Sequence, residues 1–286
     1  MFKICKHQLA LAFSSPRIYI ALIIGCIIQL FDAINLLDYA NMIDKPLCIF
    51  ENFIYFNCNH HTSSVAFSGI LLLIADVPFT SEIEMYTLIR TDRKKWVLGK
   101  VCYLLCICFI YYFLMAIISM IYISENAYLG NFWSEGIYYM AKNPKTDIVV
   151  NRGLFFPYTN IITKFTPVIA FIASFTLSVL YAFLMSLMAF YLNLKISYKM
   201  SFIGITMTHL IGYFVVLSSI NIDHIKYYIF GNSLLKYHNI YNYYGDDCFI
   251  NLSHSYILFI GIIVILNLLI FKGIKKYDFK ITIGSK

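Results

Sequence analysis

The sequence predicts an all-α membrane protein with six transmembrane helices. Hydrophobic residues make up 60% of its 286 residues and charged residues only 13%, whereas a soluble domain is roughly half apolar and about a quarter charged. Runs without charged residues lie at 52–75, 101–124, 165–194, 200–222 and 248–271, each close to the roughly 20 residues that cross a bilayer. A sixth, shorter run at 18–31 reaches that length if Asp32 lies at the outer interface.

The expected order along the chain is one membrane domain covering 1–286. Residues 2–14 begin it with Phe2, Cys5, Leu9 and Phe13 near one helical face, before Ser14-Ser15-Pro16 ends the pattern. This pattern predicts an elbow helix in the cytoplasmic interface, and a disordered basic terminus is the alternative. The six spans follow at about 18–37, 62–79, 98–123, 166–192, 201–220 and 255–273.

Lysine and arginine predict the orientation. With both termini inside, the outer segments hold seven of the 22 basic residues, which leaves 15 (22 minus 7) for the shorter cytoplasmic segments. The positive-inside rule therefore places both termini in the cytoplasm of a multi-pass protein of the cell membrane. The net charge of +7 is a topology signal and not evidence of nucleic-acid binding. Abundant Ile, Asn, Lys and Tyr suggests a bacterial source. The outer basic residues are Lys45, Lys142, Lys145, Arg152, Lys164, Lys226 and Lys236.

The long polar segment 76–100 is the best sequence clue to function, because the other cytoplasmic segments are short. Ser81 and Glu84 have the spacing of a capping box just after Pro78, which predicts a short helix over 82–89. Arg90-Thr-Asp-Arg93 then breaks that helix, and Lys94-Lys95-Trp96 would anchor span three in the headgroup region. The alternative is a basic loop that serves topology alone.

A family resemblance appears in this segment. Pro78-Phe79, Glu82, Glu84, Arg90-Thr91-Asp92-Arg93-Lys94-Lys95-Trp96 and Gly99-Lys100 resemble the loop after span two in permeases of ABC-2 type exporters. The elbow, the six spans, the inside termini and the tail Lys275-Lys276-Tyr277-Asp278 are similar to that family in layout. The likeness at sequence level covers about 25 residues, and short motifs of this kind are loose.

The resemblance implies that the segment is a coupling helix, which docks on a separate ATPase subunit. The residues expected to contact the ATPase are Glu82, Glu84, Met85, Tyr86, Ile89, Arg90 and Arg93. ATP and Mg would be bound by that subunit, and this chain would bind no cofactor and would not be an enzyme by itself. A phosphate loop is absent from the sequence, since Gly99-Lys100 lacks the upstream glycine and the following Ser or Thr.

The resemblance also implies a second permease copy or a paralogue, and export of a peptide, a lipid-like molecule or a drug, or immunity to one. Small residues recur at every fourth position of span four, and glycines follow in span five. Such stripes let helices approach closely in lipid. We expect packing within the bundle, with a subunit interface as the alternative, at Ala170, Ser174, Ser178, Ala182, Ser186, Gly204 and Gly212.

Three ionisable residues lie near or within spans, where they are costly. We expect Asp76 to pair with Lys94, Lys95 or Lys100. His209, near the middle of span five, is expected to be neutral and bonded to a serine of span four. Asp32 is expected to reach outward.

The outer segments contain weaker patterns. Cys48 and Cys58 are candidates for a disulfide, although a third outer cysteine, Cys248, would be left over. Cys58-Asn-His60-His61 lacks a second ligand pair at fixed spacing, so no metal site is expected. The tyrosines between 227 and 244 predict an interfacial aromatic belt.

Two other classes of function compete with the exporter. A membrane-embedded enzyme would need converging catalytic groups, and the chain has no H-E-x-x-H, no G-x-S-x-G and no paired carboxylates in one span. A membrane sensor or scaffold that does not transport would bind a soluble partner through 76–100 without coupling to ATP.

Overall fold

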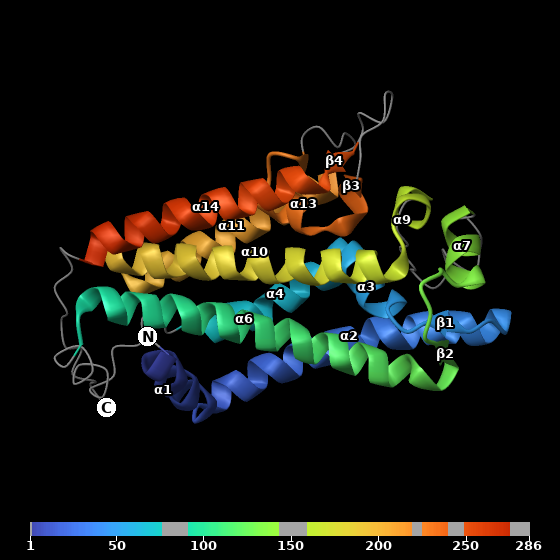
Figure 1. Ribbon diagram of the computed structural model, residues 1–286, viewed down its shortest axis with the longest axis horizontal. Helices are drawn as coiled ribbons and strands as arrows, with labels where there is room; N and C mark the ends of the chain where they lie inside the picture. The colour runs from blue at the N-terminus through green and yellow to red at the C-terminus, as the bar shows by residue number, and fades with distance from the viewer. Residues whose placement is uncertain (1, 76–90, 143–158, 219–224, 240–248, 275–286) are drawn as a thin grey trace.

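The computed structural model describes residues 2–75, 91–142, 159–218, 225–239 and 249–274. They form an elongated helical bundle whose long helices run side by side (Figure 1). Five helical segments are long and apolar enough to cross a membrane: Pro16–Ile43, Arg93–Asn126, Pro167–Lys195, Tyr198–Ser218 and Leu252–Gly273. The chain is therefore an all-α, multi-pass membrane protein.

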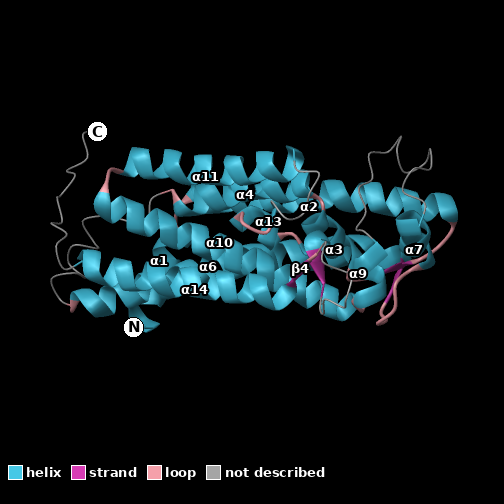
Figure 2. Cartoon of the chain, turned by 90° about the horizontal axis from the view of Figure 1, so that it is seen from above, coloured by secondary structure: helices cyan, strands magenta, loops and turns pink. Residues whose placement is uncertain are grey.

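The central helix is α10 (Pro167–Lys195), the most buried of the five. It packs against α6 (Arg93–Ile123), α11 (Tyr198–Ser218) and α14 (Leu252–Gly273). Helix α2 (Pro16–Ile43) lies on the far side of α6, with α4 (His60–Ile74) beside it. Figure 2 shows the same bundle from above. Only Ile196 and Ser197 separate α10 from α11, between the expected spans at 166–192 and 201–220.

Two of the long helices extend beyond the expected spans. Helix α2 was expected to end near residue 37, but it continues to Ile43. There Asp44 adopts a left-handed conformation (φ 52°), and its N–H reaches the carbonyls of Ala40 and Asn41. Helix α6 begins at Arg93 and not near 98, because the side chain of Asp92 caps it by accepting from the N–H of Lys94. At about 1.5 Å per residue, these helices are roughly 42 and 46 Å long.

The run 52–75 is not one continuous helix. It consists of α3 (Glu51–Cys58), which is buried along its whole length, and α4, which starts after a break at Asn59. The backbone of Asn59 is extended (φ −83°, ψ 105°), and its side chain accepts from the N–H of His61 to cap α4. The described part of α4 is shorter than the five spanning helices.

A small module covers the C-terminal end of α2. Strand β1 (Leu47–Cys48) pairs in parallel with β2 (Ala127–Tyr128), which follows the short η1 helix (Ser124–Asn126). Helix α7 (Glu135–Lys142) and α9 (Thr159–Lys164) complete it. The carboxylate of Glu51 accepts from the N–H groups of Cys48 (2.8 Å) and Ser134 (2.7 Å). Burial raises the pKa of Glu51 to about 7, although these hydrogen bonds oppose the shift.

The connection between α11 and α14 forms a second module. It contains α13 (Ile229–Ser233), the η2 helix (Leu235–Tyr237) and β3 (His238–Asn239), which pairs in parallel with β4 (Ile250–Asn251). The first module lies at the end of the bundle opposite α1 (Phe2–Phe13), which packs against α6, and α13 lies nearer the middle of the bundle (Figure 1). The helix expected over residues 2–14 is therefore present.

The outer surface of the bundle is apolar. On α2, the exposed residues Ile20, Ile23, Ile27, Phe31 and Ile34 follow a three- and four-residue spacing. Such a stripe of large exposed side chains is unusual in a soluble protein and is what a lipid-facing surface requires. Equivalent side chains are exposed on α14.

Close packing in the interior of the bundle depends on two glycines. Gly25 on α2 and Gly69 on α4 both face the ring of Tyr111 on α6. A β-carbon at Gly25 would lie 2.7 Å from the Tyr111 hydroxyl oxygen. That hydroxyl donates to the carbonyl of Ala66 (2.7 Å), so the ring is held between the three helices.

Candidate functional site: a buried polar network at the break between α3 and α4

The break at Asn59 lies beside a line of buried polar groups. Asn57, fully buried at the end of α3, donates to the hydroxyl of Ser178 on α10 (2.9 Å) and to the carbonyl of Ser233 (3.1 Å). The Oδ1 atom of the Asn57 side chain accepts from the backbone N–H of Leu235 (2.8 Å). One asparagine thus joins the interrupted helix to the central helix and to the α11–α14 connection.

That connection is held from its other side as well. His238 is fully buried, and its Nε2 lies 2.7 Å from the hydroxyl of Ser255 on α14. Ser255 in turn donates to Asn232 (2.6 Å). Asn160 on α9 donates to the carbonyl of His238 (3.1 Å) and to the side chain of Asn239 (3.2 Å). Burial lowers the pKa of His238 to about 4, so this histidine is neutral near pH 7.

Ionisable groups continue from this module into the bundle. The Nζ of Lys236 lies 2.8 Å from Nδ1 of His60, the first residue of α4. The ring of His60 lies 4.0 Å from that of His61, whose Nδ1 is 2.8 Å from the hydroxyl of Tyr213 on α11. Burial lowers the pKa of Lys236 to about 8, so its ammonium form is destabilised there.

His209 extends the line towards the middle of α11. Its Nδ1 lies 2.7 Å from the hydroxyl of Tyr181 and its Nε2 lies 2.8 Å from that of Ser64. The ring stacks on Phe67 at 4.2 Å. We expected a serine of span four as its partner. That was wrong: the partner on α10 is a tyrosine, and the serine comes from α4.

A cavity of about 220 Å³ adjoins this line. It lies between α10, α11 and α13, and its lining includes Tyr181, Thr208, Gly212, Tyr228 and Phe230. Tyr181 and Phe230 both contact the ring of His209, so the cavity borders the polar line directly.

Asp32 contradicts its sequence prediction most clearly. It was expected to reach the outer interface, but it is 1% exposed, because α2 continues past it to Ile43. It faces Thr62 in the first turn of α4. Its Oδ2 and both amide atoms of Gln29, one turn earlier, are buried with no hydrogen-bond partner among the described residues. A carboxyl in a membrane-spanning helix marks a functional site by default.

The small residues expected to mediate packing are buried inside the bundle. Ser174, Ser178, Ala182 and Ser186 on α10 are each at most 4% exposed, as is Ala170. Ser178 bonds to α3, and the hydroxyl of Ser186 lies 3.4 Å from the thiol of Cys108 on α6. On α11, Gly212 packs against Phe230, and Gly204 lies near Leu192 of α10.

Helix α6 contacts α1 and the end of α14 near its own start. Lys100 on α6 is fully buried, and its Nζ donates to Gln8 of α1 (2.5 Å). Arg93 donates to the carbonyl of Ile274, just beyond α14 (3.4 Å). Trp96, expected in the headgroup region, is only 1% exposed and packs edge-on against Phe190. It is a core residue because α6 begins earlier than expected.

The remaining residues expected to contact the ATPase lie outside the described residues, as does Asp76. These are Glu82, Glu84, Met85, Tyr86, Ile89 and Arg90. Cys48 and Cys58 are both free, buried thiols, so the disulfide considered for them is not formed. Cys48 donates to the carbonyl of Gly130 (3.3 Å). Of the outer tyrosines described, Tyr227 and Tyr228 are exposed, as a belt requires, and Tyr237 is buried.

Comparison of the chain with protein-family models, with curated proteins and with solved structures gives no match in any of the three. The function is therefore argued from the helices and the polar network.

The sequence contained a signal for part of this network. Asn, His and Cys cluster between 57 and 61 within the charge-free run 52–75, just before the expected start of span two. The partners from α9, α10, α13 and α14 had no such signal, because they come from distant segments that only the fold brings together.

Proposed function

We propose that this protein is the permease subunit of an ATP-driven ABC exporter of the ABC-2 type, with α4 as the second of six spans. The single observation that supports transport is the interrupted helix α3–α4 beside Asp32, His60 and Lys236. Transporter binding sites are typically built where a membrane helix is broken and polar groups line the gap. A rigid structural bundle would have little need for these buried ionisable groups.

The coupling of this site to ATP rests on the sequence resemblance of residues 78–100. In this proposal the segment docks on a separate ATPase, which binds ATP and Mg. A second permease copy or a paralogue completes the complex, and the termini are cytoplasmic. Helix α1 acts as the elbow. Its contacts with α6 through Gln8 and Lys100 support this role, since a push on the start of α6 would also move α1.

The exported molecule is expected to be a peptide, a lipid-like molecule or a drug. The outer end has a cavity of about 600 Å³, within the usual range for ligand pockets of about 300–1,000 Å³. Its lining combines aromatic rings, Trp133, Tyr138 and Tyr139, with the charged side chains of Lys45, Glu135 and Lys142. This mixture suits an amphipathic molecule that leaves the membrane on that side.

The test is co-purification of the full-length protein from its native membrane under mild detergent, followed by an assay of vanadate-sensitive ATP hydrolysis. Wild type is compared with the double variant Glu84→Ala/Arg90→Ala and with Lys195→Ala/Lys199→Ala. The last pair is the control, because these two lysines are exposed at the turn between α10 and α11 and lie outside residues 78–100. We expect wild type and the control to retain an ATPase, and the coupling variant to lose the ATPase or its stimulation.

Recovery of wild type without any ATPase would contradict the exporter proposal and favour the enzyme or the scaffold. Equal ATPase recovery and stimulation in all three proteins would show that the complex forms but that Glu84 and Arg90 do not couple it to ATP hydrolysis. In reconstituted complexes, Asp32→Asn should leave ATPase recovery unchanged but alter its stimulation by the transported molecule, because Asp32 lies far from the cytoplasmic end.

A further inference from the structure

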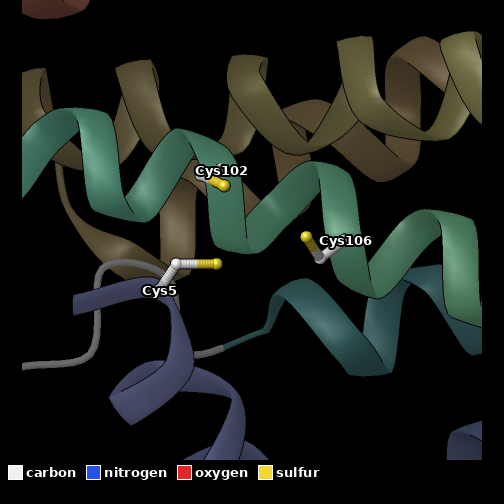
Figure 3. Close-up of side chains that lie close together, drawn as sticks. All are labelled: Cys5, Cys102 and Cys106. Atoms are coloured by element: carbon white, nitrogen blue, oxygen red, sulfur yellow. The ribbon is translucent and has the colours of Figure 1, made fainter. Parts of the chain in front are cut away.

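Three thiols meet where α1 packs on α6. Cys5 comes from α1, while Cys102 and Cys106 lie one turn apart on α6, and the three sulfur atoms are all within 4.8 Å of one another. Figure 3 shows Cys5 directed at the two thiols of α6. Cys5 is 5% exposed and the other two are half-buried. Among the described residues, no other group of three or more His, Cys, Asp or Glu side chains converges in this way.

The two helices hold these thiols in register. Residues four apart share a helix face, so Cys102 and Cys106 both point to the same side of α6. Cys5 and Gln8 likewise share the face of α1 that packs on α6. The hydrogen bond from Lys100 to Gln8 lies next to the cluster on both helices and fixes their relative position. The cluster is therefore preorganised by an independent contact.

The spacing suits a metal ion with three sulfur ligands. A metal–sulfur bond of about 2.3 Å in a trigonal site separates the sulfur atoms by roughly 4.0 Å. Small side-chain rotations would bring the three sulfur atoms from within 4.8 Å to that separation. Thiolates select soft cations, of which Cu(I) accepts three ligands, whereas structural zinc sites almost always use four. The converging group contains no fourth ligand among the described residues.

We propose that Cys5, Cys102 and Cys106 bind one soft, three-coordinate cation of the Cu(I) class, and that the bound ion locks α1 onto α6. On binding, each ligating thiol releases its proton to solvent and its sulfur donates an electron pair to the metal, with no change of oxidation state. Lys100, two residues before Cys102, is fully buried and donates to Gln8, so the only described cation beside the cluster is already held on α1. This inference does not depend on the transport proposal, because it concerns α1 and α6 alone.

The competing explanation is that the three cysteines are small apolar residues that happen to pack together. The two explanations differ in what the reduced protein does with a metal. A packing cluster would have no particular affinity for Cu(I), and replacing one cysteine by alanine would change only stability.

The test is an anaerobic titration of the reduced full-length protein in detergent, with Cu(I) supplied by a chromophoric chelator of known affinity. We expect one Cu(I) per chain, and X-ray absorption should give three sulfur ligands at about 2.3 Å. Cys102→Ala and Cys106→Ala should each weaken binding by roughly tenfold or more, because two thiolates replace three. Cys26→Ala is the matched control, since Cys26 is a half-buried cysteine on α2 outside the cluster.

A second measurement tests whether the bound ion holds α1 against α6. Hydrogen exchange of residues 2–13 should slow when Cu(I) is added to wild type and stay unchanged in Cys106→Ala. Lack of Cu(I) binding by wild type in competition with the chelator would overturn the proposal, whether or not the variants fold. Equal loss in Cys26→Ala, or zinc binding as tight as copper binding, would also overturn it.

Discussion

Single buried polar residues do most to distinguish this bundle from a plain hydrophobic one. Asn57, His209 and His238 each bond through both ends of the side chain, which a buried polar group requires to offset its loss of water. Asp32 and Gln29 differ, because they keep buried atoms without partners among the described residues. The contrast separates residues that fix the fold from residues available for a ligand or water.

Lys236 gives a prediction with a defined pH window. Its pKa is about 8 in the folded protein and near 10.5 when unfolded. Between these values the unfolded state binds more protons, so the unfolding free energy rises with pH through this window. Lys236→Met removes this contribution. Relative to the variant, wild type should gain stability on the order of 3 kcal/mol from pH 8 to pH 10.5.

The measurement is denaturant unfolding of both proteins in the same detergent across that range. Taking the difference between them removes contributions from groups that do not interact with Lys236. The lost contact with His60 adds an offset. A difference that stays constant with pH would show that the ammonium of Lys236 is not penalised by burial.

At the scale of helices, close approach between two helices depends on where glycine or another small residue leaves room. Tyr111 occupies space between α2 and α4 that exists only because positions 25 and 69 are glycine. The same rule holds for the stripe on α10, where small side chains let α3 and α6 approach. These helices are therefore specified as neighbours by size as much as by hydropathy.

Gly25→Ala and Gly69→Ala should both destabilise the bundle, by about 1–3 kcal/mol, because the new methyl group meets a ring that cannot move freely. At Gly69 the backbone carbonyl of Ala21 is also only 3.0 Å from the added carbon. Gly261→Ala on α14 is the control, since nothing lies within 4 Å of its β-carbon. Thermal unfolding in detergent should show a lower midpoint than wild type for the first two variants and an unchanged midpoint for the control. Equal midpoints for all three would contradict close packing around Tyr111.

For the molecule as a whole, the two ends of the helical bundle carry different elements. The described helices place α1 and the start of α6 towards one end, and α7 with β1 and β2 towards the other (Figure 1). Helix α6 is longer than the roughly 30 Å of a hydrocarbon core, so it is long enough to reach past both faces of a bilayer. The lysine and arginine bias predicts that its start is cytoplasmic.

This orientation is tested with single cysteines at the two ends of α6. Glu125→Cys and Lys95→Cys introduce thiols at exposed positions just beyond the outer end of α6 and near its inner start. In intact cells, a membrane-impermeant maleimide should label the first and not the second, and permeabilised cells should label both. Wild type measures the background from its native thiols. Labelling of Lys95→Cys from outside would reverse the assigned topology.

The sequence by itself determined that the chain is a helical membrane protein, where its long helices lie, and that small residues line α10. Those properties are local, because hydropathy, length and residue size are read along one segment. The C-terminal end of α2 and the start of α6 were missed, since these helices are capped at Asp44 and Asp92, beyond the expected bounds at 37 and 98.

Only the tertiary structure decided which polar residues meet. Asp32 is buried because α2 continues outward and α4 covers it, and His209 selects Tyr181 and Ser64 because three helices converge there. The thiols of Cys5 and Cys106 are about a hundred residues apart in the chain, and no spacing rule links them. Burial and hydrogen bonding between distant segments depend on packing, which is set by all helices together and not by any one of them.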